Sequence, residues 1–172
     1  HRDLHYPLRR QRQMCIRDRM YNTCIIYEKG KLLGSYSKQN LYFAEEGIIT
    51  PGESIKVFSA YGIKFGILIC ADVFLEQYFI KLKDMGAKLI FIPTFSPRRQ
   101  ETPEEKFKRD NDIFVRGAKT ADTVIVKVCS VRSEFRTELQ GRSLIADRNG
   151  IIFRVMPEQE DDEIIILREI TI

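Results

Sequence analysis

Short apolar runs separated by turn signals occupy most of the chain from Thr23 onward. The runs TCIIYE and KLLGSY flank a Lys-Gly turn and predict a β-hairpin over 23–36. A polar loop with a Pro-Gly break follows over 37–55. Two more strands are predicted over 55–60 and 64–70. The second is almost wholly apolar, so we expect it to be buried on both faces.

Helical periodicity follows in two places. Apolar residues at positions 74, 75, 78, 79, 82 and 85 form one stripe and predict a helix over 74–85, which Gly86 closes. A second helix is predicted over 103–121, because Thr102 can cap it and the Pro-Glu-Glu that follows suits the positive end of a helix dipole. The remaining apolar runs predict strands over 87–93, 123–130, 143–148, 151–155 and 163–172.

This order of strands and helices predicts an α/β fold in which helices cover a mixed sheet. With 172 residues and 44% apolar content, the chain is long enough for one domain with its own core. Two helices can cover only one face of such a sheet. The other face is therefore expected to need partners that these helices do not supply.

The first 19 residues differ from the rest in composition. They hold six arginines, two aspartates and both histidines, which accounts for the whole net charge of +4. The body of the chain is therefore electrically balanced and gives no electrostatic reason to bind nucleic acid. We interpret residues 1–19 as an artefactual or disordered basic tail that is not homologous to the domain over 20–172. A native RNA-binding arm is the alternative.

The remaining composition predicts a soluble cytoplasmic protein. No apolar run is long enough to span a membrane, and the start of the chain lacks the apolar region of a secretory signal. The four cysteines are Cys15, Cys24, Cys70 and Cys129, and no two of them have CxxC spacing. We expect free thiols rather than a disulfide framework.

Cys70 is the strongest candidate for chemistry, because it lies where an apolar strand meets a predicted helix. Backbone N–H groups at such a junction can stabilise a thiolate or an oxyanion, although a lone cysteine in an apolar run also fits simple core packing. No histidine occurs outside the tail, so a Cys–His pair is excluded and the activating groups have to be Lys, Glu or Asp. The candidates are Lys38 and Glu45 in the polar loop, and Asp72 and Glu76 near the cysteine.

Several segments in order resemble the carbon–nitrogen hydrolase (nitrilase-like) family. YSKQNLYFAEEGIITPGES is followed about twenty residues later by GIKFGILICADVF, as in that family's lysine loop and nucleophile strand. Further matches are Tyr21-Asn22-Thr23, IFIPTFS, Arg116, GRSLIADRNG and EIIILREITI. The resemblance implies a four-layer αββα sandwich, of which residues 20–172 would be the C-terminal part. The missing first strands would then explain the uncovered sheet face.

The resemblance also implies roles for individual residues. Cys70 would be the nucleophile, Lys38 would stabilise the oxyanion, and Glu45 would orient Lys38 and the substrate. Asp72 would be a structural hydrogen-bond acceptor. The expected oxyanion and substrate-binding residues are Ala71 through its backbone N–H, Glu46 as the alternative to Glu45, and Thr94.

One departure from the family pattern affects the expected activity. The family's general base is a glutamate in a segment before Tyr21, and residues 1–19 offer only Asp3 and Asp18 as carboxylates. We therefore expect this chain to be impaired as an enzyme, because the thiol would keep a pKa of about 8.5 without a base. True nitrilases of that family have Trp-Glu after the cysteine, so the resemblance with Ala71-Asp72 at this place implies amides or carbamoyl compounds rather than nitriles.

The expected partner is a small-molecule amide or carbamoyl substrate. The resemblance implies a cofactor-free, metal-free hydrolase that forms a homo-oligomer at full length and binds neither membrane nor nucleic acid. Two alternatives stay open. One is a catalytically inactive homologue that acts as an interaction module, and the other is a nucleic-acid binder through the basic tail.

Overall fold

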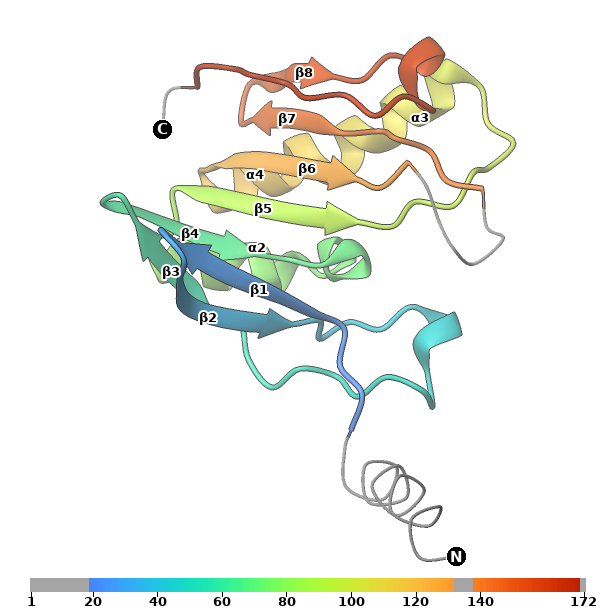
Figure 1. Ribbon diagram of the computed structural model, residues 1–172. Helices are drawn as coiled ribbons and strands as arrows, with labels where there is room; N and C mark the ends of the chain where they lie inside the picture. The colour runs from blue at the N-terminus through green and yellow to red at the C-terminus, as the bar shows by residue number, and fades with distance from the viewer. Residues whose placement is uncertain (1–18, 132–137, 171–172) are drawn as a thin grey trace, which may run out of the picture.

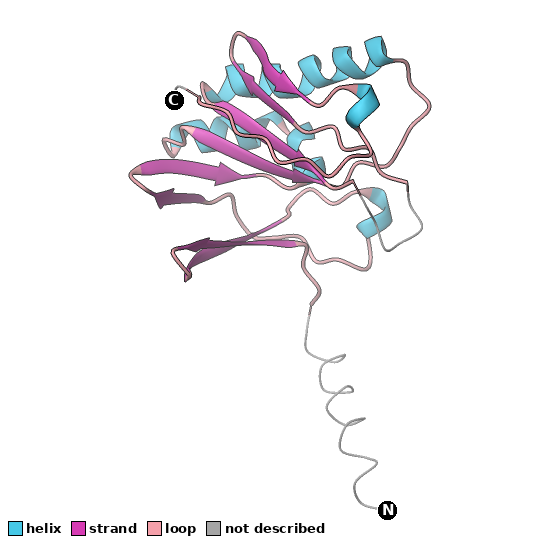
Figure 2. Cartoon of the chain, turned by 45° about the horizontal axis from the view of Figure 1, so that its top comes forward, coloured by secondary structure: helices cyan, strands magenta, loops and turns pink. Residues whose placement is uncertain are grey.

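The computed structural model describes residues 19–131 and 138–170. Its centre is a six-stranded mixed sheet in the order β3-β4-β5-β6-β7-β8, with helices on one face and the separate hairpin β1-β2 on the other (Figure 1, Figure 2). The strands are β1 Thr23–Glu28, β2 Lys31–Ser37, β3 Val57–Ala60, β4 Ile63–Ile67, β5 Leu89–Thr94, β6 Val124–Cys129, β7 Leu144–Asp147 and β8 Gly150–Arg154.

Strands β4, β5 and β6 run parallel in the middle of the sheet, and the other pairs are antiparallel. Parallel pairing requires a crossover connection, and here each crossover passes through helix. Helix α2 (Glu76–Asp84) joins β4 to β5, and a longer helical segment joins β5 to β6. The carboxyl ends of the three parallel strands consequently meet at one edge of the sheet.

The longer helical segment consists of α3 (Pro103–Asp110), a π-helical turn (Asn111–Val115) and α4 (Arg116–Ala121). It confirms the helix predicted over 103–121, with Thr102 as the N-cap. The π-helical turn was not predicted. Such turns insert an extra residue and are frequent near functional sites.

The core lies between these helices and the sheet. Ile90 and Ile92 of β5 and Ile125 of β6 are fully buried there, together with Leu82 of α2. On the other face, Tyr36 of the hairpin is fully buried, whereas Val128 of β6 is 53% exposed. The mixed sheet with helices on one face agrees with the predicted architecture, and the second face is only partly covered.

The strand predicted over 163–172 is wrong for the part that the structure describes. Residues 163–170 form no strand, and residues 171–172 lie outside the described residues. Ile165 and Leu167 are 95% and 89% exposed. Alternating apolar residues favour a strand, but a strand also needs a neighbouring backbone to bond with, and this segment does not pair with β8. No helix in the two described stretches is long and apolar enough to cross a membrane.

Candidate active site

A cavity of about 960 Å³ opens at the edge where β4, β5 and β6 end. Five of the six predicted site residues line it, namely Lys38, Glu45, Cys70, Ala71 and Thr94. Glu46 is exposed and is not among the lining residues. The structure therefore brings together side chains from the loop after β2, the turn after β4 and the end of β5.

Cys70 lies on a bend rather than on a regular strand-to-helix junction. Strand β4 already ends at Ile67, and Cys70–Phe74 form a 3-10 turn before α2 begins at Glu76. The Cys70 φ of 48° lies in the left-handed region, which costs a non-glycine residue of order 1 kcal/mol. Its Sγ lies 3.6 Å from the backbone oxygen of Phe95 and faces the cavity.

The predicted start of the helix at Phe74 is therefore two residues too early. Phe74 also does not pack in the core, since it is 58% exposed and lines the cavity. The apolar stripe alone could not show this, because cavity-lining and core positions have the same hydrophobic signature.

Asp72 holds this bend in place. Its carboxylate is fully buried and accepts hydrogen bonds from the Tyr36 hydroxyl at 2.8 Å and the Ile69 backbone N–H at 2.9 Å. It also accepts from the backbone N–H groups of Gln39 at 3.1 Å and Asn40 at 2.7 Å. Burial, and then the adjacent carboxylate, raise the pKa of Tyr36. The prediction that Asp72 is a structural acceptor is confirmed.

Lys38 and Glu45 form an ion pair in the cavity wall. The Lys38 side chain is only 2% exposed, and its ammonium donates to Glu45 Oε2. Glu45 also accepts from the Tyr42 backbone N–H at 2.8 Å and from Asn22 Nδ2 at 2.9 Å. Burial alone would raise the pKa of Glu45, but these three hydrogen bonds outweigh it and the pKa is lowered. Glu45 is thus held ionised, and it fixes the position of the lysine.

The backbone around Lys38 is anchored on both sides. Its N–H donates to the Asn22 carbonyl at 2.9 Å, and its own carbonyl accepts from the Gly52 N–H at 2.7 Å. A Cβ at Gly52 would lie 2.1 Å from the Ser37 carbonyl oxygen, so only glycine allows this approach. The Pro-Gly break in the sequence therefore serves to bring the loop back against Lys38.

Two asparagines support the site although no sequence pattern predicted a role for them. Asn22, from the Tyr-Asn-Thr motif, binds Glu45, and Asn40 Nδ2 donates to the Ala71 carbonyl oxygen at 2.6 Å. The second bond ties the peptide between Ala71 and Asp72 to the lysine loop. Asn22 and Glu45 are 23 residues apart in the sequence, and Asn40 and Ala71 are 31 residues apart. No local sequence pattern indicates contacts over such separations.

A second group of cavity residues was also missed. Lys127 of β6, Asp110 of α3 and Phe114 of the π-helical turn line the same cavity. The available signal was the single lysine in the apolar run TVIVKVCS, at a position that the structure buries. No group of three or more metal-binding side chains occurs among residues 19–131 and 138–170.

The family model for carbon-nitrogen hydrolases matches residues 4–172, so the chain belongs to the carbon-nitrogen hydrolase family. The match begins within the first 19 residues, and the structure of residues 1–18 lies outside the described part.

Among curated relatives, the glutamine-dependent NAD(+) synthetase of Acinetobacter baylyi is 24% identical over 83% of this chain and 26% of its own length. An omega-amidase of Xenopus tropicalis is 27% identical over 60% of this chain and 43% of its own length. The chain therefore spans less than half of either relative.

Solved structures of two such proteins are also similar to this chain. The glutamine-dependent NAD+ synthetase of Acinetobacter baumannii superposes with a TM-score of 0.68 at 26% identity, over 78% of this chain and 26% of that chain. A mutant of the Nesterenkonia AN1 amidase from the nitrilase superfamily has a TM-score of 0.67 at 20% identity, over 77% and 50% of the two chains. The predicted nitrilase-like α/β fold is confirmed.

Proposed function

We propose that this protein hydrolyses the C–N bond of small amide or carbamoyl compounds with Cys70 as nucleophile. The observation that carries the proposal is the buried Lys38–Glu45 pair, which lines the same cavity as Cys70. Family membership supports it, and so do relatives named as an omega-amidase and a glutamine-dependent synthetase.

The proposed reaction has two halves. The Cys70 thiolate attacks the carbonyl carbon, so a C–S bond forms while the C=O π pair moves to oxygen. When the C=O re-forms, the C–N bond breaks, the nitrogen gains a proton and leaves as ammonia or an amine, and a thioester remains. Water then attacks the thioester, the C–S bond breaks, and the carboxylic acid and the thiol are released.

Lys38 and the Ala71 N–H are proposed to stabilise the oxyanion. A donor that is already fixed in place needs no reorganisation when charge develops, and removing one such donor costs about 3 kcal/mol of barrier. Lys38 meets this requirement because Glu45 holds its ammonium inside the cavity wall. The Asn40 bond to the Ala71 carbonyl fixes the peptide chain around the second donor.

Neither of the two cavity carboxylates, Glu45 and Asp110, is proposed as the base that transfers protons. Glu45 is bound by Lys38, and Asp110 accepts from Arg142 at 2.7 Å. Each carboxylate is therefore already engaged by a cation in the cavity wall. We therefore place the proton-transferring base outside this pair.

The test compares two cysteines of the same cavity. Burial raises the pKa of Cys129, which keeps its thiol protonated. With a panel of small amides and carbamoyl compounds, Cys70→Ala should abolish turnover and Cys129→Ala should retain most of it. Mass spectrometry of the quenched wild type should show the acyl group on the peptide that contains Cys70. Turnover that survives Cys70→Ala would refute the proposal, and a folded wild type that shows neither turnover nor an acyl group on Cys70 would favour the inactive homologue.

A further inference from the structure

Asn22 contacts both members of the ion pair in the cavity wall. Its backbone carbonyl accepts the Lys38 N–H at 2.9 Å, and its side-chain Nδ2 donates to Glu45 Oε1 at 2.9 Å. Asn22 immediately precedes β1 and lines the same cavity as Cys70. One residue therefore holds the lysine loop through its backbone and the glutamate through its side chain.

The Asn22 side chain supplies the contact that fixes the plane of the Glu45 carboxylate. The Lys38 ammonium and the Tyr42 backbone N–H both donate to Oε2. Within the part of the chain that the structure describes, the donor to Oε1 is Asn22. A carboxylate held at one oxygen can still turn about the bond that joins it to the chain, whereas one held at both oxygens cannot. Asn22 thus restricts the rotation that would move Oε2 away from the lysine.

The chemistry of the contact decides which end of the Asn22 amide faces the glutamate. An ionised carboxylate only accepts hydrogen bonds, so the NH2 group and not the oxygen has to point to Oε1. Burial raises the pKa of Glu45, and the hydrogen bonds from Lys38, Tyr42 and Asn22 lower it below its ordinary value. Because Asn22 is neutral, it stabilises the carboxylate without repelling the Lys38 ammonium, as a second cation would.

We propose that Asn22 is a positioning residue of the reaction, which acts through Glu45 on the oxyanion-stabilising ammonium of Lys38. The inference rests on the proposed function and extends its machinery by one residue. An oxyanion donor is effective only when it is in place before charge develops. A Glu45 carboxylate that is free to turn lets the ammonium move with it, so loss of the Asn22 donor should weaken the stabilisation of the transition state.

The sharpest variant is Asn22→Asp, which keeps the shape of the side chain and the backbone bond to Lys38 but replaces the donor with a carboxylate. Two carboxylates in contact repel each other when both are ionised, whereas at lower pH they share a proton that restores the hydrogen bond. At about pH 8, Asn22→Asp should lower kcat/KM by about tenfold or more. As the pH falls to about 5.5, the ratio of this variant to wild type should rise by about threefold or more.

Two further variants complete the comparison. Asn22→Ala should lower kcat/KM by about three- to tenfold, the loss of one hydrogen bond, and its ratio to wild type should not rise as the pH falls. The catalytic cysteine titrates in every variant, so the ratio removes its contribution.

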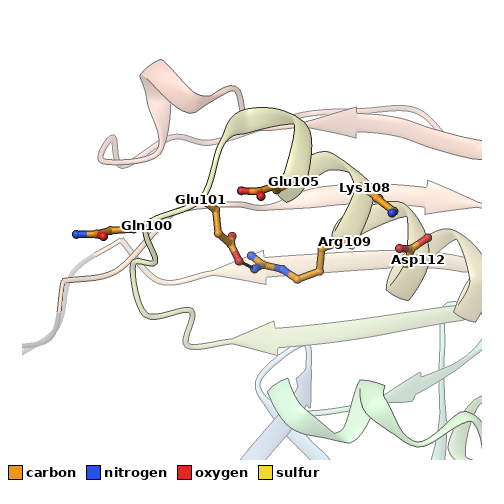
Figure 3. Close-up of a pocket in the computed structure, with 6 residues that line it drawn as sticks. All are labelled: Gln100, Glu101, Glu105, Lys108, Arg109 and Asp112. Carbon is orange, nitrogen blue, oxygen red and sulfur yellow. Dashed lines mark hydrogen bonds and ion pairs between the residues drawn. The ribbon is translucent and has the colours of Figure 1, made fainter.

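The matched control is Gln100→Glu, another change from amide to acid next to a carboxylate. Gln100 is exposed, and it lines a separate pocket together with the ion pair of Arg109 and Glu101 (Figure 3). Its ratio to wild type should stay within about twofold at every pH, because a charge added in water acts weakly on a distant site.

A second measurement does not depend on turnover. The titration of the Glu45 carboxyl group is followed by NMR in protein with isotope-labelled glutamate, and Glu45→Gln assigns the signal. Asn22→Ala should raise the titration midpoint of Glu45, because a donor to the ionised form is lost. The inference is wrong if this midpoint is unchanged, or if the Asn22→Asp ratio does not rise as the pH falls. An inactive wild type would refute the proposed function, whereas an unchanged midpoint in an active enzyme would refute only the inference.

Discussion

The Tyr36 hydroxyl donates a 2.8 Å hydrogen bond to the Asp72 carboxylate, and both side chains are fully buried. This bond connects the hairpin that precedes Lys38 with the turn that begins at Cys70. The same carboxylate accepts from two backbone N–H groups directly after Lys38. One buried carboxylate therefore sets the position of the lysine loop relative to the cysteine.

The first prediction concerns this bond. Tyr36→Phe should lower the free energy of unfolding by about 1–3 kcal/mol, because it leaves a buried acceptor short of one donor. Asp72→Ala should destabilise more, since it leaves four donors without their acceptor. Urea unfolding at neutral pH measures both. Tyr27→Phe, at a tyrosine that is 63% exposed, is the control and should have almost no effect.

The second prediction separates two neighbouring glutamates. Glu45→Gln should lower kcat by about tenfold or more, because the neutral amide holds the Lys38 ammonium less firmly, while Lys38→Met should lower it by about 10²–10³. Glu46→Gln should leave kcat within about twofold, since its side chain is exposed outside the cavity lining. Steady-state kinetics on the best amide of the panel measures all three. A larger loss in Glu46→Gln than in Glu45→Gln would contradict the assigned pairing.

The third prediction is a pH dependence of stability. The pKa of Glu45 is lower in the folded state than its unfolded value of about 4.3. A lowered carboxylate pKa gives stability that is present above the unfolded pKa and is lost as the pH falls through the folded pKa. Wild type should therefore lose more stability between pH 6 and acidic pH than Glu45→Gln does. Thermal unfolding across that range checks this, and parallel curves would exclude a linked role for Glu45.

The fourth prediction tests the close approach at Gly52. Gly52→Ala should destabilise by about 1–3 kcal/mol, because its methyl group would meet the Ser37 carbonyl and displace the loop from Lys38. The same variant should lose activity at temperatures where it is still folded. Glu53→Ala, at the exposed next position, is the control and should change neither quantity. Unfolding curves and kinetics on the same samples separate the two effects.

Much of the fold could be predicted because it depends on local patterns. The Lys-Gly and Asn-Gly turns predicted hairpins that the structure contains as β1-β2 and β7-β8. The 3.6-residue stripe predicted α2, and the Thr102 cap with its Pro-Glu-Glu predicted the helical segment that ends at Ala121. Gly52 and Asp72 stood out in the sequence, and each makes contacts of the kind that its residue type suggests.

Other features were decided only by the tertiary structure. Residues 163–170 have a strand-like pattern but no neighbouring backbone to pair with, so they do not form a strand. The bend at Cys70 depends on a carboxylate that binds backbone groups more than 30 residues away. The buried ion pairs of Asp110 with Lys127 and Arg142 join three separate parts of the chain. Periodicity shows which face of an element is buried, but the electrostatic energy of a buried charge depends on which other charges lie within a few ångströms of it. For this protein the sequence by itself determined most of the elements and the family, because these depend on local patterns, and only the packing of distant segments decided which charges face the cavity.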